Sequence, residues 1–148
     1  MFKNVLIPTD GSAVANKAVK AGVQLAKELG ATVTGYCAVE AVQPHVYGEG
    51  YLITNRILFK AYEQRAREAA ATELAAMAKL AAAAGVPFQG VVTVAQTAYE
   101  GIIAAAKKHK CDAIFMASHG RGALAGLMLG SVTQKVLAHS KLPVLLYR

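Results

Sequence analysis

The chain has 148 residues, of which 55% are hydrophobic and 17% charged, and its formal net charge is +7. This composition excludes a disordered chain. No apolar run approaches the ~20 residues that span a bilayer. We therefore expect one cytoplasmic domain over residues 1–148 that does not bind membranes. The basic residues are scattered and lack interleaved aromatic residues, so the positive charge does not predict a nucleic-acid partner.

Short apolar runs alternate with helical patterns from the start of the chain. The first run, residues 2–7, predicts a strand. Apolar residues then recur every three or four positions over 14–29, with Ser12 as the N-cap and Gly30 after the last turn, which predicts a helix. Residues 31–39 predict the second strand.

The same alternation continues to the end of the chain. Residues 40–55 have the composition of a loop, and the apolar period that follows predicts a helix over 57–84. The spacing of Thr97 and Glu100 is typical of a capping box that opens the next helix. The remaining expected elements are strands over 88–94, 112–116 and 143–147 and a helix over 131–139.

The expected order is therefore β-α-β-α-β-α-β-α-β. Strands without polar alternation that are joined by helices predict a parallel sheet covered on both faces. We expect a doubly wound α/β domain with a single five-stranded parallel sheet, in the order 3-2-1-4-5. Ligands of such folds bind beyond the carboxyl ends of the strands where the strand order reverses, which here is between the first and fourth strands.

These two strand ends carry the residues best suited to a ligand. The first strand is followed by PTDGS (8–12) and the fourth by ASHG (117–120). Asp10 could accept hydrogen bonds from ribose hydroxyls. Glycines let backbone N–H groups approach a phosphate and a helix N-terminus adds partial positive charge, so GSVT (130–133) could supply amides and two hydroxyls. Arg121 could add charge at the rim.

The glycines between residues 120 and 130 also permit a purely structural interpretation, a loop that packs tightly after a strand. No P-loop sequence is present, and the GxGxxA at 120–125 follows the fourth strand without an acidic partner for a ribose, which disfavours a dinucleotide site. His119 is the best general-base candidate, but we expect its neighbour Ser118 to be unable to pair with it. We therefore expect no catalytic residues and no metal-binding cluster.

Several motifs, taken together and in order, resemble the universal stress protein family over nearly the whole chain. They are VLIPTDGS (5–12), DAIFMASHG (112–120), LGSVT (129–133), KVL (135–137) and PVLL (143–146). The resemblance implies a homodimer paired through the last strands. One branch of the family binds ATP through a sequence motif, and the resemblance implies such binding here. The motif consists of a glycine, two residues of any type, a second glycine, nine residues of any type, and then Gly-Ser or Gly-Thr. Gly120 and Gly130 match this spacing, whereas Ala117 replaces the first glycine.

The resemblance also implies a role for each matching residue. Asp10 would contact the ribose, Val39 the adenine through its backbone, and Gly120, Gly130, Ser131 and Thr133 the phosphates. The full set of implied binding residues is Pro8, Thr9, Asp10, Val39, Met116, Ala117, His119, Gly120, Gly130, Ser131, Val132 and Thr133.

The expected function is that of an ATP-binding, dimeric stress-response regulator with an unidentified protein partner. Mg²⁺ or Mn²⁺ would arrive with the triphosphate. Two alternatives stay open: a dimeric interaction module of the same fold that binds no nucleotide, and a slow ATPase in which His119 positions a water molecule.

Overall fold

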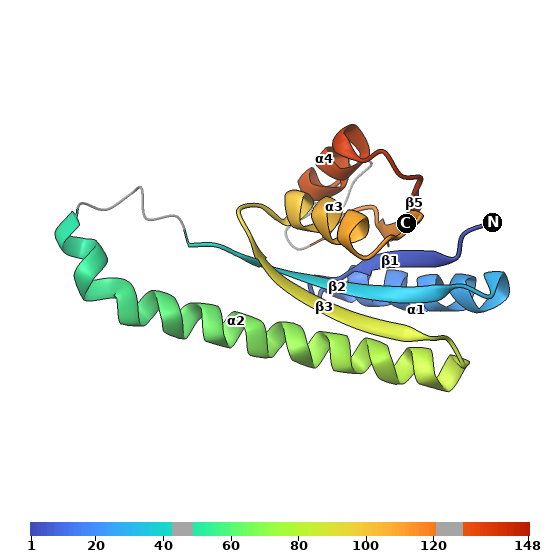
Figure 1. The fold of residues 1–148 in the computed structure, drawn as a ribbon, viewed down its shortest axis with the longest axis horizontal. Helices are drawn as coiled ribbons and strands as arrows, with labels where there is room; N and C mark the ends of the chain where they lie inside the picture. The colour runs from blue at the N-terminus through green and yellow to red at the C-terminus, as the bar shows by residue number, and fades with distance from the viewer. Residues whose placement is uncertain (43–48, 121–128) are drawn as a thin grey trace.

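The computed structural model describes residues 1–42, 49–120 and 129–148. Strands and helices alternate along the chain, as Figure 1 shows. The elements are β1 (Asn4–Pro8), α1 (Ala13–Leu29), β2 (Thr32–Glu40), α2 (Glu49–Ala84), β3 (Phe88–Ala95), α3 (Ala98–Lys108), β4 (Ala113–Ala117), α4 (Ser131–His139) and β5 (Val144–Tyr147).

The five strands form one parallel sheet in the order β3-β2-β1-β4-β5. This confirms the predicted fold class and strand order. The central strand β1 pairs with β2 on one side and with β4 on the other, so the order reverses between β1 and β4. The loops that follow these two strands therefore leave the same edge of the sheet side by side.

Helices cover both faces of the sheet (Figure 1). Under α1 and α2, the buried side chains of Ile7, Val19 and Met77 belong to one core cluster. On the opposite face, Leu6 of the same strand packs with residues of α3 and α4, among them Ile102 and Val136. Successive side chains of β1 thus enter opposite cores, which explains why the strand is an uninterrupted apolar run.

The ends of α1 follow the sequence prediction. Ser12 Oγ accepts a hydrogen bond from Ala15 N, and Gly30 ends the helix with a φ of 63°. The predicted capping box at α3 is wrong. Thr97 Oγ1 donates to Glu100 Oε2 at 2.7 Å and caps no backbone amide. The Glu100 carboxylate thus bonds the hydroxyl of Thr97, whereas in a capping box each side chain bonds the backbone N–H of the other residue.

Helix α2 begins at Glu49, eight residues before the position that the apolar period predicts. Residues 49–55 are thus helical rather than part of the expected loop, and residues 43–48 lie outside the described part of the chain. Apolar residues need to recur at the helical period only where the helix packs on the core, at Ala70, Leu74 and Met77. Adding residues to an existing helix needs no new nucleation, so the helix extends beyond the sheet (Figure 1).

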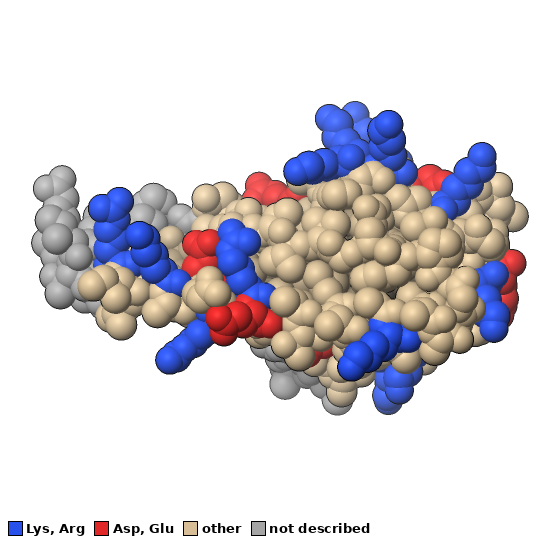
Figure 2. All heavy atoms as spheres, turned by 60° about the horizontal axis from the view of Figure 1, so that its bottom comes forward, with Lys and Arg blue, Asp and Glu red and all other residues tan. Residues whose placement is uncertain are grey.

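The surface agrees with the scattered charge in the sequence. In Figure 2, basic side chains are spread along the length of one face, between uncharged and acidic atoms. Cys37 and Cys111 are buried, and neither forms a disulfide with a described residue. Within residues 1–42, 49–120 and 129–148, none of the helices combines the length and apolar composition that a bilayer span requires.

Candidate functional site

The loops after β1 and β4 meet at Asp10 and Gly120. A methyl group built on Gly120 would lie 2.5 Å from Asp10 Oδ2, closer than real side chains allow. The absence of a side chain at Gly120 is therefore what lets the carboxylate lie against the backbone of the second loop. Two residues 110 positions apart in sequence form the centre of the site.

Local hydrogen bonds hold Asp10 in this orientation. Its Oδ1 accepts a bond from Ser12 N at 2.9 Å, and Gly11, with a φ of 75°, makes the turn between them. Thr9 Oγ1 accepts a bond from Gly11 N at 3.1 Å, and Thr9 N donates to Tyr36 O of β2 at 2.9 Å. The turn is thus fixed to the sheet on one side and to the start of α1 on the other.

Gly130 brings the N-terminus of α4 onto the end of β4. Its N–H donates to Ser118 O at 2.9 Å, and a methyl group at this position would lie 3.0 Å from His119 Cα. Its φ of −62° is ordinary, so close packing and not backbone conformation calls for glycine here. The first bond of the helix runs from Gln134 N to Gly130 O.

The amides of residues 131–133 therefore precede the first intrahelical bond, and no side chain caps this end of α4. Such amides, with the positive end of the helix dipole, can bind an anion. Ser131 is exposed at this end. Thr133 is 2% exposed, and its hydroxyl donates to Ala117 O at 3.1 Å. That hydroxyl anchors α4 to β4, so the backbone N–H is the donor that Thr133 has left for an anion.

Ala117, which replaces the first glycine of the family motif, ends β4 in an ordinary conformation. Among the described non-glycine residues, only Lys110 has a positive φ. The Ala117 methyl is buried in the same core cluster as Val19 and Phe115, on the α1 face of the sheet. The methyl group therefore adds to the core without straining the backbone.

Ser118 and His119 form a pair that the sequence argument excluded. Ser118 Oγ lies 3.0 Å from His119 Nδ1, so the expectation that adjacent residues cannot pair is wrong. The alternation of side chains between faces holds within a strand, and β4 ends at Ala117, so the two side chains can turn toward one another. Ser118 is only 2% exposed, which keeps its hydroxyl from acting as an accessible nucleophile.

The register of the sheet determines which residue of β2 directs its backbone toward the place where a base would bind. Val33 N donates to the carbonyl directly before β3, whereas Thr32 N donates to the carbonyl directly before β1. Odd-numbered residues of β2 therefore direct their backbone groups toward β3 and even-numbered residues toward β1. The backbone of Val39 thus faces β3, whereas that of Ala38 points toward the end of β1.

Ala38 is consequently a candidate that the sequence argument missed. Continuing the register from Pro8 and Tyr36 places it opposite Asp10. A sequence pattern could not distinguish Ala38 from Val39, because that choice depends on which residues of β2 pair with β1.

The remaining predicted residues flank this centre. Pro8 ends β1 and is half-buried, and Met116 is buried on the α3 and α4 face, in the strand position before Ala117. Arg121, Gly122 and Gly126 lie outside the described residues. Among the residues that are described, no group of three or more His, Cys, Asp or Glu side chains could hold a metal ion.

Known proteins resemble this chain over its whole length. A profile of the universal stress protein family matches residues 1–148. The chain is 35% identical over 150 residues to the Thermus aquaticus universal stress protein in the QAH/OAS sulfhydrylase 3′ region, and the match covers 100% of both chains. It is 32% identical over 152 residues to universal stress protein MJ0531 of Methanocaldococcus jannaschii, covering 100% of this chain and 83% of that protein.

Solved structures show the same architecture. The structure of hypothetical protein MJ0577 superposes with a TM-score of 0.82 at 25% identity, covering 99% of this chain and 95% of that one. A universal stress protein in complex with cAMP has a TM-score of 0.72 at 23% identity, covering 99% and 97%. One from Archaeoglobus fulgidus in complex with dAMP has a TM-score of 0.59 at 15% identity, covering 100% and 98%. The chain belongs to the universal stress protein family.

Proposed function

We propose that this chain is an ATP-binding stress-response regulator that holds the nucleotide between the loops after β1 and β4. The observation that carries the proposal is the position of the Asp10 carboxylate against Gly120, at the point where the strand order reverses. The complexes of universal stress proteins with cAMP and dAMP support a nucleotide as the ligand class.

Each part of the nucleotide has a chemically suitable partner at this site. The Asp10 carboxylate, an acceptor-only group, suits the ribose hydroxyls. The amides of residues 131–133 and the close backbone at Gly120 and Gly130 suit the phosphates. Ala38 suits the base through its backbone, with Val39 beside it. Pro8, Thr9, Met116, Ala117 and His119 complete the surroundings.

A divalent cation would bind to the triphosphate and supply charge neutralisation there. The donors that the chain itself offers at the phosphate end are backbone amides and the Ser131 hydroxyl, which fit an anion rather than a bare metal ion. We therefore assign Mg²⁺ or Mn²⁺ to the nucleotide and not to a resident site of the protein.

The functional unit in this proposal is a homodimer paired through β5. This strand is an edge of the sheet, and its four residues are apolar and half-buried. An open edge offers unpaired N–H and C=O groups to a second copy of itself. Nucleotide binding at the neighbouring β4 loop would then alter the surface that the dimer presents to its protein partner.

Slow ATP hydrolysis is the second candidate, and the Ser118–His119 pair is the observation that favours it. The bond between Ser118 Oγ and His119 Nδ1 orients the imidazole ring, which leaves Nε2 as the atom that could position a water molecule. Steady turnover that His119→Ala abolishes while ATP affinity persists would establish this activity.

The test of the main proposal is ATP binding by Asp10→Asn, measured by calorimetry and thermal shift with Mg-ATP. Asparagine keeps an oxygen for Ser12 N but loses the charge, so affinity should fall at least about tenfold, since hydrogen bonds to charged groups contribute about 1.5–3 kcal/mol. Glu28→Gln, an exposed acid that bonds only Gln24 among the described residues, is the matched control. Absence of any thermal shift in the wild-type chain at millimolar Mg-ATP would refute the proposal.

A further inference from the structure

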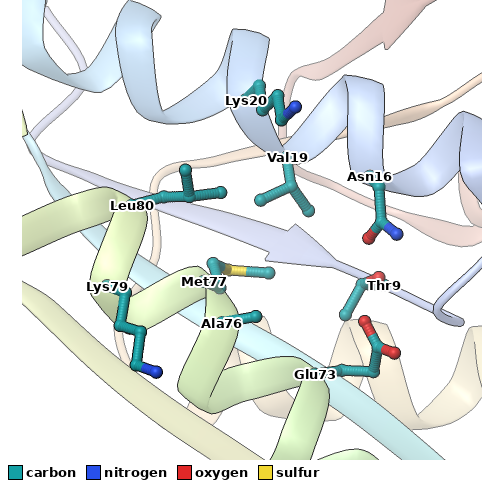
Figure 3. Close-up of a pocket in the computed structure, with 9 residues that line it drawn as sticks. All are labelled: Thr9, Asn16, Val19, Lys20, Glu73, Ala76, Met77, Lys79 and Leu80. Carbon is teal, nitrogen blue, oxygen red and sulfur yellow. The ribbon is translucent and has the colours of Figure 1, made fainter.

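A separate cavity of about 450 Å³ lies between α1 and α2, on the face of the sheet that these two helices cover. Its volume falls within the range of small-molecule sites. We call it the α1–α2 cleft, and we define it by Asn16 and Val19 of α1 and by Glu73, Ala76, Met77 and Leu80 of α2 (Figure 3). Thr9 lies at one end and is the residue that the cleft shares with the site at the strand ends.

One end of the cleft is apolar. Val19, Met77 and Leu80 direct their side chains into the space between the two helices (Figure 3). Val19 is 4% exposed and Met77 1%, so they form the floor, whereas Leu80 is 37% exposed and forms an outer wall. An apolar group that enters here removes its own surface and part of Leu80 from water, and the flexible Met77 thioether can adapt to its shape.

The other end is polar, and its groups converge. Thr9, Asn16 and Glu73 point toward one another in Figure 3. Among the described residues, the Glu73 carboxylate and the Asn16 side chain have no hydrogen-bond or ion-pair partner. Thr9 Oγ1 accepts one hydrogen bond, from Gly11 N, and can accept a second one. Three side chains thus offer oxygen acceptors to the same space.

No basic side chain among the described residues forms an ion pair with Glu73. Lys20 and Lys79 also border the cleft, but in Figure 3 their side chains extend along its outer rim and not toward the Glu73 carboxylate. Glu73 is half-buried, so an ion pair there is less screened by water than one at an open surface. A ligand that carries positive charge would therefore gain most at this end.

We propose that the α1–α2 cleft binds a small molecule with a primary ammonium head and an apolar body. The three N–H donors of the ammonium group match the oxygens of Glu73, Asn16 and Thr9. The body lies over Val19 and Met77, against Leu80. The proposal does not rest on nucleotide binding, because the ligand contacts of the cleft, apart from Thr9, belong to α1 and α2.

Three probes that share a phenethyl body and differ in the head group test the chemistry: phenethylamine, phenethyl alcohol and hydrocinnamate. Each is titrated into the full chain without nucleotide and followed in two-dimensional amide NMR spectra. Phenethylamine should shift the signals of α1 around Asn16 and of α2 around Ala76. The alcohol should bind at least about tenfold more weakly, as expected for the loss of a charged hydrogen bond, and the carboxylate should not bind.

Two variants locate the site. Glu73→Gln should abolish the preference for the amine over the alcohol, and Ala76→Leu, at an exposed position of α2, should fill the cleft and abolish binding of both. Glu68→Gln on the same helix is the control, because its carboxylate is exposed and bonds Gln64. The proposal is overturned by equal binding of the carboxylate, by undiminished amine preference in Glu73→Gln, by shifts confined to other elements, or by no binding of any probe.

Discussion

The Asp10 carboxylate lies against the backbone of Gly120, where a methyl group would come within 2.5 Å of Oδ2. This contact joins the loop after β1 to the loop after β4. It also makes Gly120 a position where the smallest possible substitution should disturb the site and little else, since residue 120 lies beyond the end of β4.

Gly120→Ala should therefore weaken ATP binding at least about tenfold, because the added methyl displaces a carboxylate whose hydrogen bonds are worth about 1.5–3 kcal/mol. Isothermal titration with Mg-ATP measures the effect. Gly90→Ala is the matched control, since a methyl there meets Leu74 and Phe88 at an ordinary 3.5 Å. An unchanged dissociation constant in Gly120→Ala would contradict a role for this contact.

Ala117→Gly restores the first glycine of the family motif. The variant shows whether the Ala117 methyl group affects the stability of the fold or the binding of ATP. The Ala117 methyl lies in the core on the α1 face, and a glycine within a strand is entropically unfavourable, so the free energy of unfolding should fall by about 1 kcal/mol. ATP affinity should not change. Urea denaturation and calorimetry measure the two quantities, and a large gain in affinity would show instead that the methyl obstructs the nucleotide.

The buried Tyr36 predicts a loss of stability in alkaline solution. Desolvation by burial raises the pKa of Tyr36 above its ordinary value of 10.0, against a smaller lowering by its hydrogen bond with Thr93. In the unfolded chain the phenol ionises at about its ordinary pKa, whereas in the folded chain it keeps its proton. Stability is therefore complete below about pH 10 and falls as the pH rises from there through the higher folded pKa.

Tyr36→Phe should reduce this alkaline loss while lowering the free energy of unfolding at neutral pH by about 0.5–1.5 kcal/mol, the net value of one hydrogen bond. Thermal unfolding at a series of pH values measures both. Cys111, whose pKa burial also raises, remains in the variant, so part of the alkaline loss should persist. The same pH profile in both proteins would exclude Tyr36 as a source.

The proposed dimer can be tested at a single backbone N–H. Ile114 N and Ser118 N donate to Pro143 O and Tyr147 O, so odd-numbered residues of β5 pair with β4. The N–H of Leu146 consequently points outward at the free edge. Leu146→Pro should remove an intermolecular hydrogen bond without breaking the ladder to β4, and the dimer should dissociate.

Analytical ultracentrifugation of Leu146→Pro and of Leu146→Ala measures this effect. The alanine variant loses the same apolar side chain and keeps the N–H, so it should remain dimeric at concentrations where the proline variant is a monomer. If both variants dissociate equally, side-chain packing and not edge pairing holds the dimer. If both stay dimeric, the contact lies elsewhere.

The sequence by itself determined the alternation of strands and helices, the parallel sheet and the ends of α1, because these depend on local composition and on caps such as Ser12 and Gly30. It also predicted Asp10 as a site residue through its place after the first strand, and Gly120 and Gly130 through the spacing of the family motif that they resemble. It could not determine the start of α2, since a helix extends without further apolar contacts once it has formed.

Only the tertiary structure decided how the site residues meet. Strand register directs the backbone of Ala38, rather than Val39, toward the end of β1, and a shift of one residue would reverse that choice. The pairing of Ser118 with His119 and the anchoring of Thr133 to Ala117 O depend on where β4 ends and how α4 docks. The strand register and the docking of α4 join segments that are distant in sequence, and the adjacent Ser118 and His119 can turn toward one another only because β4 ends at Ala117, so no local pattern encodes these contacts.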